Sequence, residues 1–279
     1  MTTEDQHVVD FYTRHPISAE HILMRVEQDR GHLDGVTAAD LFPYDQDHYG
    51  GLAANAALAT RADLQSGFKI ADFCAGLGGP ARWWATQYDV DVTGIELNPD
   101  RASGAQRLTQ VVGLQDSVRV VQGNVLTPPV DDNAMDAVLS QEAFLHIPDK
   151  REALRQAYRI LRPGGRLAFT DWVMHQPLSA DEAQDMWQGI AAQTLQNPEG
   201  YRGMIAEVGF EAVSMDDLTA DWGDILAERL EMYRKLRTQT AQAGTPSGDD
   251  AFFDSYVRLV DHVRQRKLGG ARFSAVKPG

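Results

Sequence analysis

"IADFCAGLGGPARWWA", residues 70–85, runs from an apolar stretch through a glycine-rich turn into a segment of helical character. A strand that ends in such a turn and continues into a helix places backbone N–H groups at the helix N-terminus, where the helix dipole is positive. Glycine also lets a ligand come close to the backbone. We therefore expect this turn to hold a polar and partly anionic ligand.

Around this turn, short apolar runs alternate with amphipathic stretches between residues 69 and 170, the pattern of strand, helix and strand in a parallel sheet. "LRPGGR" is expected to stop a helix, because proline and two glycines follow its last turn. The sequence predicts an α/β fold with a seven-stranded, mostly parallel sheet. We expect strands near 69–73, 91–96, 118–122, 135–140, 166–170, 209–218 and at "ARFSAVK", and helices near 80–88, 99–112, 149–161 and 200–207.

Three segments stand outside this alternation and suggest a helical lid. Residues 1–66 look helical and are expected to close the ligand site over a core that spans 67–221. Within that core, residues 179–195 are expected to form a lid helix. Residues 222–268 are expected as a helical lid insertion, in which helices at 222–243 and 250–267 are joined by "AGTPSGDD". Residues 269–279 are then expected to return to the core as its final strand.

The composition narrows the classes of partner. The 26 Lys and Arg against 40 Asp and Glu give a formal charge of −14, which disfavours nucleic acid as a substrate. The single cysteine excludes an internal disulfide, and no His/Cys/Asp spacing indicates a metal site. The N-terminus lacks a signal-peptide pattern, and no apolar run approaches the roughly 20 residues that span a bilayer. We expect a cytoplasmic protein without a membrane partner; the oligomeric state, including a homo-oligomer, stays open.

The glycine-rich turn has two interpretations. Gly76, Gly78 and Ala81 satisfy the dinucleotide pattern G-x-G-x-x-G/A, with Glu96 placed 20 residues after Gly76. However, Asp72 ends the strand before the turn, where its carboxylate would face a dinucleotide pyrophosphate with like charge. S-adenosylmethionine carries a positive ammonium and a positive sulfonium, which suit this carboxylate better. Asp72 therefore favours S-adenosylmethionine, and a dinucleotide-dependent oxidoreductase remains the alternative.

Further polar groups at the strand ends extend this cofactor site. Glu96 can accept hydrogen bonds from both ribose hydroxyls, and Asn124 can reach the adenine edge, although a simple turn role is open for Asn124. Cys74 is expected to fit the turn rather than react, which requires an ordinary φ at that position. The expected cofactor-binding residues are Asp72, Cys74, Ala75, Gly76, Gly78, Glu96, Leu97, Asn124, Val125 and Gln141.

The order of these motifs resembles that of a known protein family. D72-x-x-x-G76-x-G78, Glu96, "GNV" (123–125) and "LRPGG" (161–165) together resemble the class I S-adenosylmethionine-dependent methyltransferases. "DQDHYGG" (45–51), "GLGGPAR" (76–82), "SQEAFLHIPDK" (140–150) and "FTDW" (169–172) are similar to the group that includes sarcosine/dimethylglycine and phosphoethanolamine N-methyltransferases. The resemblance covers about residues 44–172 and implies a Rossmann-like core. Cys74 and Asn124 depart from the glycine and aspartate that this family usually has.

A polar cluster follows the fourth expected strand, at the sheet edge where ligands bind in open α/β folds. Gln141, Glu142 and His146 lie within six residues there. We expect His146, with a pKa near neutrality, to accept the proton of the methyl acceptor while Gln141 and Glu142 orient it. The resemblance implies a dyad of this histidine with an N-terminal tyrosine, for which Tyr12 and Tyr49 are both candidates. A structural histidine that packs under the turn is the alternative for His146.

These observations predict a methyltransferase that acts on a small molecule, with N-methylation of an amine preferred. Aromatic faces attract cations, so Trp172 and Tyr201 would suit an amine, unless they serve as core anchors. C- or O-methylation of a natural product is the main alternative, and a fold that binds the cofactor only to regulate a partner is another. The expected catalytic residues are His146, Tyr49 and Gln141, and the expected substrate-binding residues are Glu142, His146, Trp172, Tyr12 and Tyr201.

Overall fold

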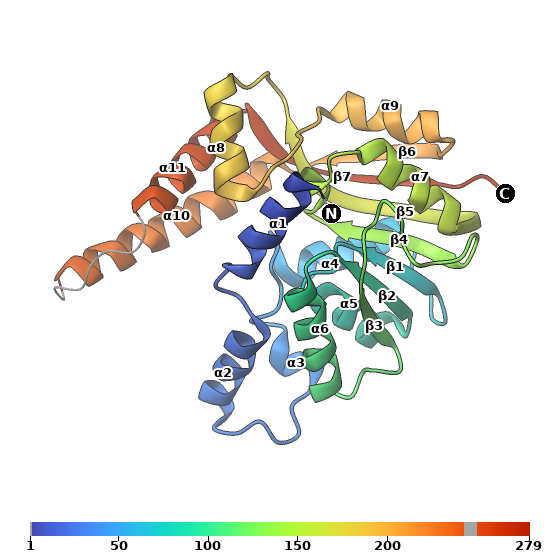
Figure 1. Ribbon diagram of the computed structural model, residues 1–279, viewed down its shortest axis with the longest axis horizontal. Coiled ribbons are helices and arrows are strands. Elements are labelled where there is room, and N and C mark those ends of the chain that lie inside the picture. Colours follow the sequence, from blue (N-terminus) through green and yellow to red (C-terminus); the bar gives the residue numbers. More distant parts are fainter. Residues whose placement is uncertain (1, 243–249) are drawn as a thin grey trace.

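A seven-stranded sheet forms the centre of the computed structural model, which describes residues 2–242 and 250–279 (Figure 1). Its strand order is β3-β2-β1-β4-β5-β7-β6. The strands are β1 (Lys69–Phe73), β2 (Asp91–Glu96), β3 (Val118–Gln122), β4 (Met135–Gln141), β5 (Leu161–Met174), β6 (Glu211–Asp217) and β7 (Leu268–Val276). The prediction of seven strands in an α/β fold is therefore confirmed.

The sheet is parallel from β3 to β5, and β7 runs antiparallel to both β5 and β6. This mostly parallel arrangement matches the prediction. β5 is longer than the predicted 166–170, because it continues along β7 as far as the pairing of Met174 with Leu268. Pairing with a second strand, which a local pattern does not report, supports this extension.

The helices flank both faces of the sheet and also cap its edge (Figure 1). The 3₁₀ turn η1 (Phe144–His146) follows β4 directly. The described helices are α1 (Thr3–Thr13), α2 (Ala19–Arg30), α3 (Ala38–Leu41), α4 (Gly51–Arg61), α5 (Gly79–Tyr88), α6 (Pro99–Val111), α7 (Lys150–Ile160), α8 (Ala180–Ile190), α9 (Pro198–Val208), α10 (Thr219–Gln242) and α11 (Asp250–Arg264).

Successive side chains of the buried strands point to opposite faces of the sheet and form two apolar clusters, one on each face. Phe73 and Val138 point to the side where α7 and α9 pack, and Ile70 and Leu139 point to the side of α4 and α5. Trp84 lies fully buried in the second cluster. Because both faces are covered, the carboxyl ends of the strands are left as the place where a ligand can enter.

The long antiparallel pair α10 and α11 extends away from the sheet (Figure 1). A third apolar cluster joins this pair to β5 and β7 and includes Trp172, Trp222 and Leu226. Most of the expected "AGTPSGDD" turn, residues 243–249, lies outside the described residues. Within the described ranges, we find no helix that is both long and apolar enough to cross a membrane.

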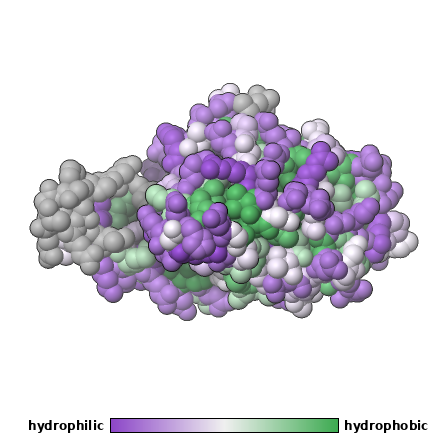
Figure 2. All heavy atoms as spheres, turned by 90° about the horizontal axis from the view of Figure 1, so that it is seen from below, coloured by the Kyte–Doolittle hydropathy of each residue, from purple (hydrophilic) through white to green (hydrophobic). Residues whose placement is uncertain are grey.

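Hydrophilic residues cover much of the face that is seen from below, around a central area of apolar ones (Figure 2). The large apolar side chains that are exposed in the described ranges come from four different helices: Met24, Leu52, Val111 and Met232.

Candidate active site

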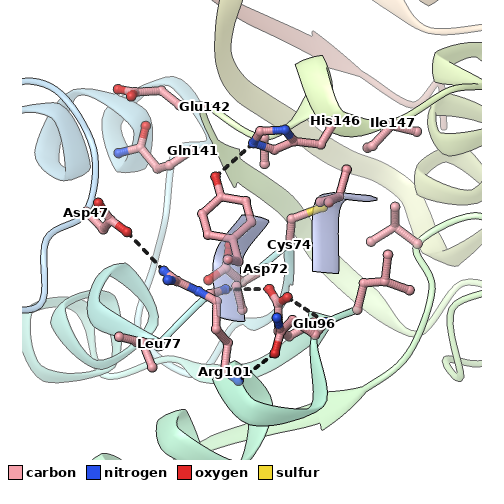
Figure 3. Close-up of a pocket in the computed structure, with 18 of the residues that line it drawn as sticks. Asp47, Asp72, Cys74, Leu77, Glu96, Arg101, Gln141, Glu142, His146 and Ile147 are labelled. Carbon is pink, nitrogen blue, oxygen red and sulfur yellow. Dashed lines mark hydrogen bonds and ion pairs between the residues drawn. The ribbon is translucent and has the colours of Figure 1, made fainter. Parts of the chain in front are cut away.

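A cavity of about 1060 Å³, including its open mouth, lies beyond the carboxyl ends of β1, β2 and β4 (Figure 3). Helix α1 supplies one wall, with Val8, Val9 and Tyr12. The glycine-rich turn, the end of β2 and the segments at 123–126 and 141–148 supply the others. Segments far apart in the sequence therefore build one enclosure at the predicted edge of the sheet.

The glycine-rich turn adopts a backbone that only small residues tolerate. Gly76 has a φ of 55°, and Gly78, with a φ of 75°, stands at the N-cap of α5. A Cβ at Gly79 would lie 1.9 Å from the carbonyl oxygen of Asp45, so this glycine permits close packing of the 45–51 segment. Cys74 has a φ of 59°, which corrects the prediction of an ordinary φ. The turn thus uses a left-handed conformation at a residue with a side chain.

A buried ion pair joins two of the motifs that carried the resemblance. Nη2 of Arg82, from "GLGGPAR", lies 2.9 Å from Oδ2 of Asp45, from "DQDHYGG", and neither side chain has any exposed area. Nη1 of Arg82 also donates to the hydroxyl of Thr109 at 3.2 Å. The pair fixes the 45–51 segment against α5, beside the cavity.

Asp72 and Glu96 form the acidic floor of the cavity. Asp72 is 2% exposed, and its Oδ2 has no hydrogen-bond partner in the described part of the chain. Burial, assisted by the charge of Glu96, raises the pKa of Asp72 well above its usual range. Glu96 accepts the backbone N–H groups of Gly76 and Asn98, both at 2.8 Å, which fixes its carboxylate at the end of β2. A buried carboxylate without a partner beside a glycine turn fits the cationic amino-acid end of S-adenosylmethionine.

The other expected cofactor residues divide into two sets. Cys74, Ala75, Leu97 and Val125 line the cavity, as do Gly76 and Asn124, whereas Gly78 caps α5 and does not line it. Oδ1 of Asn124 accepts the backbone N–H of Leu126 at 2.9 Å, so this side chain does make the turn contact that the sequence left open. Its amide nitrogen makes no hydrogen bond to the described residues and stays free to donate to a ligand.

Tyr12 and His146 meet at the covered end of the cavity. The Tyr12 oxygen lies 2.8 Å from Nε2 of His146, and Nδ1 of His146 lies 3.0 Å from the carbonyl oxygen of Ala191. Because a carbonyl only accepts, Nδ1 carries the proton and Nε2 accepts the Tyr12 hydroxyl. Burial lowers the pKa of His146 to about 4. This value corrects the prediction of a pKa near neutrality and leaves the imidazole neutral.

Tyr49, the other candidate, lies elsewhere. Its ring packs against Trp172 and Trp222, with centroids 5.8 and 5.0 Å away, and none of the three lines the cavity. Only its backbone reaches the site, by donating to Oε1 of Glu142 at 2.8 Å. The structure therefore corrects the expectation that Tyr49 and Trp172 face a substrate in this cavity.

Tyr201 also differs from its expected place. It is fully buried in the apolar cluster under β5, and its hydroxyl donates to Oδ2 of Asp171. It does not line the cavity, so the alternative of a core anchor describes it. Aromatic residues on a lid or sheet edge share one sequence pattern whether they face the core or a ligand.

Gln141 and Glu142 do lie at the cavity. The amide of Gln141 donates to Oδ1 of Asn55 at 2.9 Å and accepts the hydroxyl of Thr170 at 2.6 Å, so its orientation is fixed. Glu142 has a φ of 53°, a strained value for a residue with a side chain. Burial raises the pKa of Glu142 well above its usual range, and Arg229 opposes this effect. This part of the cavity thus holds a carboxylate on a strained backbone.

The sequence did not point to three charged residues, of which Arg101 and Asp47 line the cavity and Lys150 lies next to it. Arg101 and Asp47 form an ion pair at 3.0 Å beside the cavity. Nζ of Lys150 donates to the carbonyl oxygens of Phe144 and Ile147, at 2.5 and 3.2 Å, and so ties down the turn that carries His146. Asp47 and Lys150 stand inside quoted motifs, which was the available signal. In the described ranges no group of three or more acidic, histidine or cysteine side chains could hold a metal ion.

Residues 71–169 match the protein family described as "Methyltransferase domain". The chain is 33% identical over 155 residues to a sarcosine/dimethylglycine N-methyltransferase of Halorhodospira halochloris, covering 54% of each chain. It is 30% identical over 190 residues to phosphoethanolamine N-methyltransferase 3 of Arabidopsis thaliana, covering 68% of this chain and 38% of that protein. The chain thus spans about half the length, or less, of these curated relatives.

Solved structures support the fold at lower identity. A phosphoethanolamine N-methyltransferase 2 of Haemonchus contortus, bound to phosphomonomethylethanolamine and S-adenosylhomocysteine, aligns with a TM-score of 0.74 at 22% identity over 94% of this chain and 61% of that one. A geranyl diphosphate C-methyltransferase of Streptomyces coelicolor aligns with a TM-score of 0.73 at 16% identity over 99% and 98%. With this fold and the matched segment, residues 71–169 form a methyltransferase domain, and the chain has the fold of the class I S-adenosylmethionine-dependent methyltransferases.

Proposed function

We propose that this protein transfers a methyl group from S-adenosylmethionine to a small amine. The observation that carries the proposal is two carboxylates that line one cavity without forming an ion pair with any described residue: Asp72, which is buried, and Glu142, which is half-buried. Burial penalises an anion that lacks a counter-charge, so both positions favour a cationic ligand. One carboxylate serves the cofactor end and the other serves the acceptor end.

At the cofactor end, the chain supplies a cation-binding group and a fixed acceptor of hydrogen bonds. Asp72 would hold the ammonium, and Glu96 would accept the ribose hydroxyls with the lone pairs that its backbone contacts leave free. Asn124 would donate to the adenine edge. When bound, S-adenosylmethionine supplies a methyl carbon that its sulfonium has already activated for displacement.

At the acceptor end, an amine must react as a free base, because an ammonium has no lone pair for the methyl carbon. Glu142 has a raised pKa and faces the cavity, so it is suited to attract the protonated amine and accept its proton. His146 is a poorer base, since burial keeps its pKa at about 4 and Tyr12 occupies its free lone pair. We assign the Tyr12–His146 pair to closing the cavity against water.

Other relatives are named as methyltransferases that act on oxygen or carbon acceptors. The chain is 29% identical to a 27-O-demethylrifamycin SV methyltransferase of Amycolatopsis mediterranei and 35% identical to 24-methylenesterol C-methyltransferase 2 of Arabidopsis thaliana. Oxygen and carbon acceptors of these kinds carry no positive charge. Glu142 therefore supports the amine over both of them.

The test is an acceptor screen with labelled S-adenosylmethionine. Primary and secondary amines, phenols, alcohols and alkenes are incubated with the wild-type protein, and methylated products are identified by mass spectrometry. We expect turnover with amines, and a loss of about 100-fold in kcat/KM for Glu142→Gln. Methylation confined to oxygen or carbon acceptors would overturn the amine assignment, and a failure to bind S-adenosylmethionine would overturn the proposed function as a whole.

A further inference from the structure

Arg101 is a cavity residue that the proposed transfer does not use. It is 7% exposed, and among the described residues that line the cavity it is the one permanent cation. Its Nη2 pairs with Asp47, and its guanidinium lies 4.7 Å from the centre of the Tyr12 ring. Its Nη1 is buried and has no hydrogen-bond partner in the described part of the chain. A buried N–H without an acceptor is unfavourable, so this nitrogen points to an oxygen of a ligand.

The guanidinium sits directly against the glycine-rich turn. A Cβ at Gly76 would lie 3.2 Å from Nη2 of Arg101, so the absence of a side chain at Gly76 makes room for it. Asp72 stands four residues earlier, at the end of β1, with its own unpartnered oxygen. Figure 3 shows Arg101, Asp72 and Glu96 grouped at one end of the cavity, away from Glu142 and His146. A guanidinium with one unpartnered nitrogen and a carboxyl group with one unpartnered oxygen therefore border the same turn.

A ligand group that satisfies both must carry an anion and a cation close together. The amino-acid end of S-adenosylmethionine has this character, because a carboxylate and an ammonium are attached to one carbon. We propose that Arg101 binds this carboxylate while Asp72 binds the ammonium, an inference that rests on the proposed function. The planar guanidinium offers paired N–H groups that match a carboxylate.

Arg101 also contacts the N-terminal region of the chain. Arg101 touches Tyr12 of α1 through its ring face and Asp47 through an ion pair, so it connects both segments to the turn. Both segments also line the cavity. A carboxylate bound beside Arg101 would therefore contact a residue that joins both segments to the turn.

The experiment compares two ligands by isothermal titration calorimetry: S-adenosylmethionine and its decarboxylated form, which keeps the ammonium and the sulfonium. We expect the wild-type protein to bind S-adenosylmethionine about tenfold or more tightly than the decarboxylated form. Arg101→Met is expected to remove this preference, by weakening only the complete cofactor. Arg25→Met is the matched control, because Arg25 also lies over a tyrosine ring, that of Tyr44, but does not line the cavity.

A second variant separates carboxylate binding from the ion pair. Asp47→Asn breaks the pair and leaves the guanidinium, so we expect it to keep the preference for S-adenosylmethionine. Equal weakening of both ligands by Arg101→Met, or the same loss of preference in Asp47→Asn, would show that Arg101 only holds the fold together. If the wild-type protein binds both ligands equally well, the inference fails while the proposed function stands. If it binds neither ligand, the proposed function itself fails.

Discussion

The hydroxyl of Tyr12 and Nε2 of His146 lie 2.8 Å apart across 134 residues of sequence. Tyr12 belongs to α1, and His146 to the turn η1 that follows β4. The contact fastens the N-terminal helix over the edge of the sheet where the cofactor turn opens. It makes the first helix part of the cavity rather than an appendage to the domain.

Tyr12→Phe removes the hydroxyl but keeps the ring between Arg101 and His146. A neutral hydrogen bond contributes about 1 kcal/mol, so we expect affinity for S-adenosylhomocysteine to fall by about fivefold. Titration calorimetry measures this directly. Tyr44→Phe, which removes a hydroxyl bound to Asp29 away from the cavity, should leave the affinity unchanged. Equal effects of the two variants would contradict a closing role for Tyr12.

His146 makes the stability of the fold depend on pH in one direction. Its pKa is about 4 in the folded chain and near 6.5 when unfolded, so between these values the unfolded state binds more protons. Acidification through this window therefore destabilises the wild-type protein. His146→Gln lacks the imidazole and should not lose this contribution. Between about pH 7.5 and about pH 5.5, we expect the wild type to lose about 1 kcal/mol relative to the variant. Urea unfolding at both pH values checks this, and parallel changes in the two proteins would refute it.

Lys150 should position His146 rather than only stabilise the fold. Lys150→Met removes the donors that hold η1, so we expect it to weaken binding of S-adenosylhomocysteine and to abolish any further effect of Tyr12→Phe. Lys277→Met is a matched control, since Nζ of Lys277 also donates to two carbonyl oxygens, those of Tyr158 and Leu161, outside the cavity. Tyr12→Phe should keep its full effect in that background. If the losses of affinity caused by Lys150→Met and by Tyr12→Phe simply add in the double variant, Lys150 has only a structural role.

The Arg82–Asp45 pair should matter to stability far more than surface pairs do. Arg82→Met leaves the Asp45 carboxylate buried without its partner, for which we expect a loss of about 3–5 kcal/mol in the free energy of unfolding. Replacing both residues, as Arg82→Met with Asp45→Leu, should recover part of the loss. Arg107→Met breaks the exposed pair with Glu20 and should change stability by less than about 1 kcal/mol. Denaturant unfolding of the four proteins tests the difference, and a small effect of Arg82→Met would contradict it.

Cys74 is expected to be a fitted residue without a chemical role. Its φ of 59° suits glycine, so Cys74→Gly should bind the cofactor within about threefold of wild type, with stability changed by about 1 kcal/mol or less. Cys74→Val, which puts a branched side chain at this φ, should be clearly less stable. Burial raises the pKa of the thiol well above its usual range, so alkylation by iodoacetamide at neutral pH should be slow. Loss of all cofactor binding in a folded Cys74→Gly protein would overturn this interpretation.

Local patterns determined much of this protein from the sequence alone. The alternation of apolar runs predicted every strand except β5 within a few residues, because side-chain period and turn residues act over short distances. The glycine turn placed Asp72 at the end of its strand, and Glu96 ends the next one. Parallel strands bring their carboxyl ends to one edge, so these residues could be expected to share a site.

Tertiary structure alone decided which residues meet across long separations. It chose Tyr12 over Tyr49 as the partner of His146, and it buried Tyr201 beneath the sheet. It also brought Arg101 to the glycine turn, where no local pattern places it. The physical reason is that burial, pKa and ion pairing depend on which segments pack together. A motif fixes the direction of a side chain only relative to its own strand or helix, and the partner is supplied by the rest of the fold.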